Sequence, residues 1–216
     1  MDSLVSSGVS RDHAAGSAEA DPHTGGVYLS DSVRIAAKIL VVGHFAVGKT
    51  TFVGTMSEIR PLSTEETMTQ AGAHIDDLTG AGRKTTTTVA LDFGRLTLSD
   101  RLVLYLFGTP GQQRFAQVWK DMTVGALGAL VLIDPQRFDQ SFDVIGLLEE
   151  HDVPYAVAIN AFDGAPTYPL DKLRGALDLL PETPLVTCDA RDRKSSAAAL
   201  MALVRYLQTR AQKELA

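Results

Sequence analysis

The fold is decided by a short stretch in which an apolar segment runs into a glycine-rich loop. The apolar segment is Ile35–Val42, and the loop that follows it reads Gly43-His44-Phe45-Ala46-Val47-Gly48-Lys49-Thr50. The loop fits the phosphate-binding pattern GxxxxGK[ST], in which glycines let backbone N–H groups point at phosphates. Lys49 is expected to reach the β- and γ-phosphates, and the Thr50 hydroxyl to ligate Mg²⁺. This loop, together with Thr51, predicts a nucleotide-binding site. The alternative is a strand-to-helix turn that binds nothing.

The composition of the whole chain is that of an ordinary globular protein. Its 216 residues suffice for one α/β domain with a tail, and 45% of them are hydrophobic against 21% charged. A net charge of -6 argues against nucleic acid as a partner. The single cysteine excludes an internal disulfide framework, and no export signal is evident. The longest apolar run, 126–133, is shorter than the ~20 residues of a membrane span. We therefore expect a cytoplasmic protein with no direct membrane insertion.

The chain divides into a tail and one domain. Residues 1–31 are rich in small and polar residues with little apolar periodicity, which predicts a flexible N-terminal tail. Over residues 32–216 strand-like and helix-like segments alternate, which predicts an α/β fold on a mostly parallel sheet. The expected strands are 35–42, 89–98, 102–107, 126–134, 153–160 and 185–188, and the expected helices are 48–58, 112–122, 138–150, 170–180 and 195–212.

Three details of this pattern can be tested against a structure. The strands on either side of the turn at 99–101 are expected to be antiparallel. In the helix expected at 138–150, Phe142, Ile145 and Leu148 share one apolar face. Residues 60–84 show no clear periodicity, which predicts a long functional or disordered loop.

Four further motifs follow the phosphate loop. They are the threonine run 85–88 ahead of Val89-Ala90-Leu91-Asp92-Phe93, the element Gly108-Thr109-Pro110-Gly111-Gln112, the segment Asn160-Ala161-Phe162-Asp163, and the loop Thr187-Cys188-Asp189-Ala190-Arg191. In this order, over about residues 33–212, they resemble the motifs of Ras-like small GTPases. The resemblance implies a P-loop NTPase fold with a six-stranded, mostly parallel sheet and helices on both faces. It also implies binding of GTP and GDP, and hydrolysis of GTP with Mg²⁺.

The first two motifs carry the expected catalytic groups. The resemblance implies that Thr88, with Thr87 as second choice, ligates Mg²⁺, although four threonines are also typical of a plain strand. It implies that the Gly111 N–H contacts the γ-phosphate and that Gln112 orients the attacking water while Lys49 neutralises charge. Gly108 stands where the family has an aspartate that holds a Mg²⁺-bound water. Bacterial gliding-motility GTPases also lack that aspartate.

The last two motifs carry the expected base contacts. An aspartate at position 163 would accept hydrogen bonds from N1–H and N2–H₂ of guanine, a donor pattern that adenine lacks. Asn160 ends the strand before it, and Ala161 replaces the family's lysine. In the second loop the resemblance implies that the Ala190 N–H bonds guanine O6, with Cys188 and Arg191 beside it. Taken alone, the two segments could be a solvated turn and a loop with a structural cysteine.

The residue sequences of these motifs are most similar to those of the GTP-binding proteins of actinobacterial conservons. That resemblance implies a signalling switch with a roadblock/LC7-type regulatory protein, a sensor-kinase-like membrane protein and a small DNA-binding-type protein as partners. Arg114, or the pair Arg83 and Lys84, could supply an internal arginine finger, although a solvated role is more typical of such residues. Two other functions stay open. One is a non-catalytic module that holds nucleotide as a structural cofactor, and the other is a P-loop ATPase or kinase.

Overall fold

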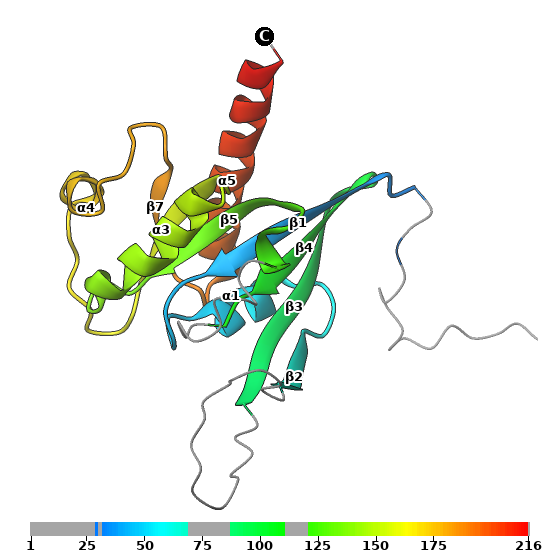
Figure 1. The fold of residues 1–216 in the computed structure, drawn as a ribbon, viewed down its shortest axis with the longest axis horizontal. Coiled ribbons are helices and arrows are strands. Elements are labelled where there is room, and N and C mark those ends of the chain that lie inside the picture. The colour runs from blue at the N-terminus through cyan, green and yellow to red at the C-terminus, as the bar shows by residue number, and fades with distance from the viewer. Residues whose placement is uncertain (1–28, 30–31, 69–86, 111–120, 216) are drawn as a thin grey trace, which may run out of the picture.

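The structure is a computed structural model, and it describes residue 29 and residues 32–68, 87–110 and 121–215. One seven-stranded sheet has the strand order β2-β3-β4-β1-β5-β6-β7, with helices packed on it (Figure 1). The strands are β1 (Ile35–Val42), β2 (Leu62–Met68), β3 (Thr87–Ser99), β4 (Leu102–Gly108), β5 (Ala126–Ile133), β6 (Tyr155–Asn160) and β7 (Leu185–Cys188). The helices are α1 (Lys49–Met56), the 3₁₀ turn η2 (Phe138–Ser141), α3 (Phe142–Glu150), α4 (Leu170–Ala176) and α5 (Arg193–Glu214).

The predicted fold class is confirmed: an α/β fold with a mostly parallel sheet. The β1, β4, β5, β6 and β7 strands are paired in parallel. The β3 strand is antiparallel to β4, as the turn at 99–101 predicted. The sheet has one strand more than the six expected, because β2 pairs antiparallel with the outer side of β3. This strand falls in a segment predicted to be a loop. An edge strand is held by backbone hydrogen bonds and tolerates charged residues, so it needs no apolar alternation.

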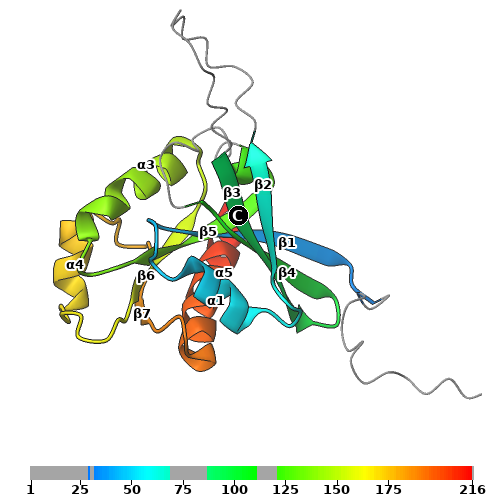
Figure 2. The same ribbon diagram turned by 90° about the horizontal axis from the view of Figure 1, so that it is seen from below.

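Both faces of the sheet are covered, which explains the near-continuous apolar strands. On one face Ile39 and Val41 of β1 pack in the cluster formed with α1 and α5. On the other face Leu40 and Val42 pack in the cluster that contains residues of α3 and α4. Figure 2 shows the two pairs of helices on opposite sides of the sheet. Helices on both faces were predicted from the family resemblance.

Some helix boundaries differ from the prediction. The α4 helix ends at Ala176, although Leu177 and Leu179 beyond it are still buried in the core. The segment 138–150 begins with a 3₁₀ turn, and Phe142 at the start of α3 is 46% exposed, whereas Ile145 and Leu148 are buried. The three residues lie three positions apart in one helix, but Phe142, its first residue, is not buried with the other two.

Other predictions fall on parts of the chain that the structure does not describe. The tail at 1–31 lies outside the described residues apart from residue 29, and the helix at 112–122 is described only at its end, where 121–123 are helical. Among the described helices, none is long and apolar enough to cross a membrane.

Candidate nucleotide-binding site

The phosphate loop joins the carboxyl end of β1 to the start of α1. Gly43 and Gly48 have φ angles of 143° and 102°, a region that side chains rarely adopt. A Cβ at Gly48 would lie 2.7 Å from the Asn160 side-chain nitrogen, and a Cβ at Gly43 would collide with the Leu132 carbonyl oxygen. Both ends of the loop therefore require glycine, which gives a physical basis for the motif.

The Lys49 side chain reaches back to the start of the phosphate loop. Its ammonium group donates hydrogen bonds to the carbonyl oxygens of Gly43, at 2.9 Å, and His44, at 2.7 Å. Burial lowers the pKa of Lys49 to about 8, and the nearby charge of Asp92 partly offsets that effect. A buried ammonium that donates to neutral carbonyls is a favourable partner for phosphate oxygens.

The remaining loop residues differ in exposure. His44 is buried, and its Nδ1 lies 2.6 Å from the Phe45 carbonyl oxygen. Its Nε2 has no hydrogen-bond partner among the residues that the structure describes. Phe45 is exposed, and Ala46 has a positive φ of 64°. Val47 is buried in the core and offers its carbonyl oxygen to Asn160. Thr50 and Thr51 are exposed in the first turn of α1.

Asn160 connects three of the predicted motifs. It is 3% exposed at the end of β6, and its side-chain N–H₂ donates to the Val47 carbonyl oxygen at 2.9 Å. Its side-chain oxygen accepts from the Ala190 N–H at 2.9 Å. The phosphate loop and the loop after β7 are thus fixed to each other through one buried amide. The sequence placed Asn160 in the site, but its bonds to both loops were not foreseen.

Asp163 and Arg191 meet at the same edge of the sheet. Two Arg191 nitrogens bond the two Asp163 carboxylate oxygens at 3.1 and 3.2 Å, while Arg191 Nε bonds Asp189 Oδ1 at 3.0 Å. These hydrogen bonds lower the pKa of both carboxyls and raise that of Arg191. Cys188 is buried, and burial raises the pKa of its thiol. Its carbonyl oxygen accepts from the Ala161 N–H at 2.7 Å.

A carboxylate that sequence reasoning missed lies beside the loop. Asp92 of β3 is buried, and the Thr50 hydroxyl donates to its Oδ2 at 2.5 Å. The available signal was an acidic residue inside an otherwise apolar strand. No group of three or more His, Cys, Asp or Glu residues suited to a metal occurs among the described residues.

Several predicted site residues cannot be placed. Thr88 lies in β3 opposite Thr67 of β2, but its side chain is outside what the structure describes. Gly111, Gln112 and the arginine-finger candidates at 83, 84 and 114 are outside the described residues.

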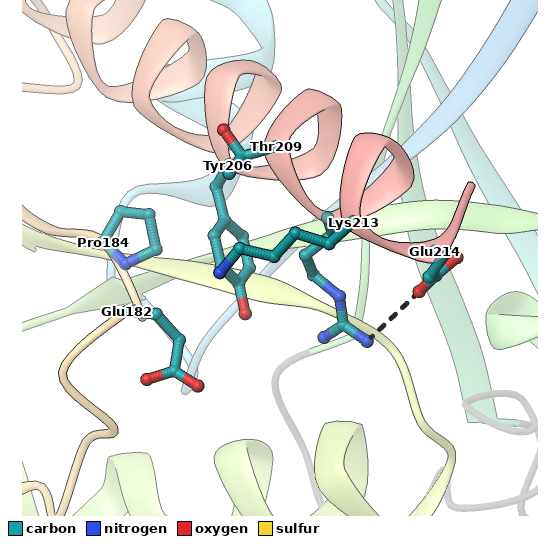
Figure 3. A pocket seen from close by; sticks show the side chains of 7 residues that line it. Glu182, Pro184, Tyr206, Thr209, Lys213 and Glu214 are labelled. Atoms are coloured by element: carbon teal, nitrogen blue, oxygen red, sulfur yellow. Dashed lines mark ion pairs between the residues drawn. The ribbon is translucent and has the colours of Figure 1, made fainter. Parts of the chain in front are cut away.

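A separate hollow of about 490 Å³ lies between α5 and the segment before β7 (Figure 3). Because it lies at the amino end of β7, it is at the opposite edge of the sheet from the phosphate loop. It is thus distinct from the site above. The side chains drawn in the figure around this hollow are Glu182, Pro184, Tyr206, Thr209, Arg210, Lys213 and Glu214.

The glycine loop at the end of a central parallel strand defines a P-loop nucleotide-binding protein, and the sheet has the fold of a G domain. The structure is similar to the FeoB G domain of Methanococcus jannaschii, with 13% identity, a TM-score of 0.53, and coverage of 80% of this chain and 98% of that one. It is also similar to the G domain of the T. maritima FeoB iron transporter, with 16% identity, a TM-score of 0.56, and coverage of 80% and 99%.

Sequence comparison identifies the family. Residues 41–210 match the family described as conserved hypothetical ATP binding proteins, and the chain belongs to it. An uncharacterized protein of Methanocaldococcus jannaschii is 32% identical over 128 residues, which are 58% of this chain and 70% of the relative.

Proposed function

We propose that this protein is a guanine-nucleotide-binding switch that hydrolyses GTP to GDP with Mg²⁺, slowly in the absence of a partner. The observation that carries the proposal is the Asn160 amide, which fixes the phosphate loop to the loop of Ala190 and Arg191. Groups suited to the phosphates and groups suited to the base therefore meet at one edge of the sheet.

The phosphate end has the groups that a triphosphate requires. Phosphate oxygens would replace the carbonyls of Gly43 and His44 as partners of Lys49, exchanging neutral acceptors for charged ones. The N-terminus of α1 adds backbone N–H groups and a favourable helix dipole. None of these groups reads the base.

The base end carries the argument for guanine. The Asp163 carboxylate is exposed and can accept from guanine N1–H and N2–H₂. Its two oxygens offer about four lone-pair sites, so the Arg191 hydrogen bonds do not use all of them. The Ala190 N–H, proposed as the donor to guanine O6, bonds Asn160 in this structure and would have to be shared.

The residues around Thr50 fit a magnesium ion. The Thr50 hydroxyl lies beside a carboxylate, and hard oxygen donors of this kind are the ligands that Mg²⁺ prefers. Thr50 and Thr88 would hold the ion, which when bound neutralises charge on the β- and γ-phosphate oxygens.

The catalytic and switching roles follow the family resemblance. Lys49 stabilises charge on the transferred phosphate, and Gln112 orients the water. Thr88 and Gly111 contact the γ-phosphate and release it after hydrolysis, which changes the affinity for partners. We further propose a cytoplasmic, conservon-type signalling role with a roadblock/LC7-type regulator and recruitment by a sensor-kinase-like membrane protein.

Two observations favour other functions. The family description names ATP, and the phosphate loop by itself does not distinguish ATP from GTP. Gly108 and Ala161, where GTPases carry an aspartate and a lysine, favour a protein that holds nucleotide without turning it over.

Calorimetric titration of the nucleotide-free protein with GTP, GDP and ATP, each with Mg²⁺, tests the proposal. We expect GTP and GDP to bind more tightly than ATP, and Lys49→Ala to weaken GTP binding strongly because the phosphate charge loses its partner. Lys213→Ala, at an exposed site near the end of α5, is the matched control and should bind as the wild type does. A preference for ATP, or unchanged GTP affinity in Lys49→Ala, would refute it.

Phosphate release with and without a roadblock-type protein then separates a GTPase from a non-catalytic module. Multiple turnover above the buffer background is expected, with faster release when the partner is present. A protein that retains nucleotide and never turns it over would be the interaction module.

A further inference from the structure

Gly108 is the last residue of β4, the strand that pairs with β1 on one side and with β3 on the other. The GTPases that this chain resembles carry at this position an aspartate that faces the metal. The antiparallel register of β3 and β4 places Asp92 directly opposite Gly108. Asp92 therefore lies beside position 108 on the neighbouring strand.

The space beside Gly108 is already occupied by the Asp92 side chain. A Cβ built on Gly108 would lie 3.0 Å from Asp92 Cβ and 3.1 Å from Asp92 Oδ2. A side chain at position 108 would therefore be crowded unless Asp92 shifted by a few tenths of an ångström. The absence of a side chain at position 108 and the presence of a carboxylate at position 92 are thus two parts of one arrangement.

The Asp92 carboxylate also faces the phosphate loop. Its Oδ2 accepts a 2.5 Å hydrogen bond from the Thr50 hydroxyl, the predicted metal ligand of the loop. Its charge acts on Lys49, where it favours the protonated ammonium. A buried aspartate is costly unless it is bonded and its charge is balanced, and both conditions are met at this site.

We infer that Asp92 supplies the carboxylate of the Mg²⁺ site from β3, in place of a residue at position 108 of β4. The inference rests on the proposed nucleotide and Mg²⁺ binding. Magnesium sites in such proteins combine a loop hydroxyl, one carboxylate and phosphate oxygens, with water completing the shell. Thr50 and Asp92 are the first two of these, already in contact.

The test measures how strongly metal binding increases nucleotide affinity, rather than GTP hydrolysis. Affinity for a fluorescent GDP analogue is measured with Mg²⁺ and with EDTA, and Mn²⁺ binding to the GDP complex is measured by electron paramagnetic resonance. In Asp92→Asn the affinity in EDTA should persist, while Mn²⁺ affinity and the gain from Mg²⁺ fall about 10- to 100-fold. Asp100→Asn, in the exposed turn after β3, is the matched control and should behave as wild type.

Variants that move the carboxylate from β3 to β4 test whether its position matters. Gly108→Asp alone should crowd Asp92 and lower the melting temperature, whereas Asp92→Gly combined with Gly108→Asp should recover part of the Mg²⁺ gain. Asp92→Ser, which keeps an acceptor for Thr50 but no charge, serves if Asp92→Asn does not fold, and should lose the gain likewise. A lower melting temperature with an unchanged Mg²⁺ gain in the Asp92 variants would show a structural role only and overturn the inference. A wild type that binds no GDP at all would instead overturn the proposed function.

Discussion

At the scale of single residues, Lys49 stabilises the phosphate loop in a form that is ready for phosphate. In this structure its partners are two carbonyl oxygens of the same loop. Burial lowers its pKa because the charged form loses solvation, and the neutral carbonyls do not restore it fully. A bound polyphosphate would supply the missing negative charge and raise that pKa again.

This gives a pH-dependent prediction for nucleotide binding. The Lys49 pKa is about 8 in the free protein, so binding should take up a proton at pH values above 8 and affinity should fall as pH rises. The uptake should be larger at pH 9 than at pH 7.5, because a larger fraction of Lys49 is then neutral in the free protein. Calorimetry of nucleotide binding in buffers of different ionisation enthalpy measures this proton uptake. Equal uptake at both pH values, or the same rise in Lys49→Arg, would contradict the assignment.

Asn160 is the residue whose loss should damage the site most widely. Asn160→Ala leaves the Val47 carbonyl and the Ala190 N–H without their partner in a buried position. Two such groups should lower the free energy of unfolding by about 2–4 kcal/mol, measured by urea denaturation without nucleotide. Gln136→Ala, at an exposed site, should change it by less than about 0.5 kcal/mol. A similar small change in both variants would argue against Asn160 as the link between the two loops.

At the scale of elements, α5 anchors one face of the sheet that carries the site. The Asp192 side chain caps the start of α5 by accepting from the Ser195 N–H at 2.7 Å. The apolar residues of α5 pack in one cluster with those of β1 and α1. Arg193 at its start bonds the Thr55 carbonyl oxygen of α1 at 2.8 Å. The helix that follows the phosphate loop is thus held by the last helix of the chain.

A substitution in α5 tests this packing. Leu203 is fully buried, so Leu203→Ala should lower the free energy of unfolding by about 2–5 kcal/mol through lost burial and a residual cavity. Met201 is 37% exposed on the same helix, and Met201→Ala should cost clearly less. Urea denaturation of both variants gives the comparison. Equal losses would mean that α5 is not packed as described.

Elements with strong apolar patterns were predictable from the sequence, and the others were not. The predicted bounds of β1 and β7 match the structure. For β1 the reason is an apolar run that is buried between two layers of helices. The β2 strand was missed because an edge strand depends on its hydrogen bonds to β3, which local pattern does not report. Phe142 was expected on the apolar face with Ile145 and Leu148, but it is the first residue of α3 and is 46% exposed, which the apolar pattern alone does not report.

At the scale of the whole molecule, the site is made by strand order rather than by any one segment. The loop after β1, the end of β6 and the loop after β7 meet because these strands are parallel and share a carboxyl edge. The motifs themselves were visible in the sequence. The role of Asp92 was not, because its proximity to Thr50 depends on the register of β3 with β4, which brings together residues 42 positions apart.

The central claim is that this edge of the sheet recognises guanine, and Asp163→Asn tests it most directly. A carboxylate matches the two donors of guanine, whereas an amide offers one donor and one acceptor, which matches N1–H and the C2 carbonyl of xanthine. Nucleotide binding is measured for GTP, XTP and ATP in the wild type and in the variant, with Asp171→Asn at an exposed site of α4 as the control.

We expect Asp163→Asn to lose GTP affinity by about 100-fold or more and to gain affinity for XTP, while ATP binding stays weak. Asp171→Asn should keep the wild-type order, with GTP bound most tightly. A wild type that prefers ATP, or an Asp163→Asn variant that binds GTP as the wild type does and gains nothing for XTP, would contradict the account.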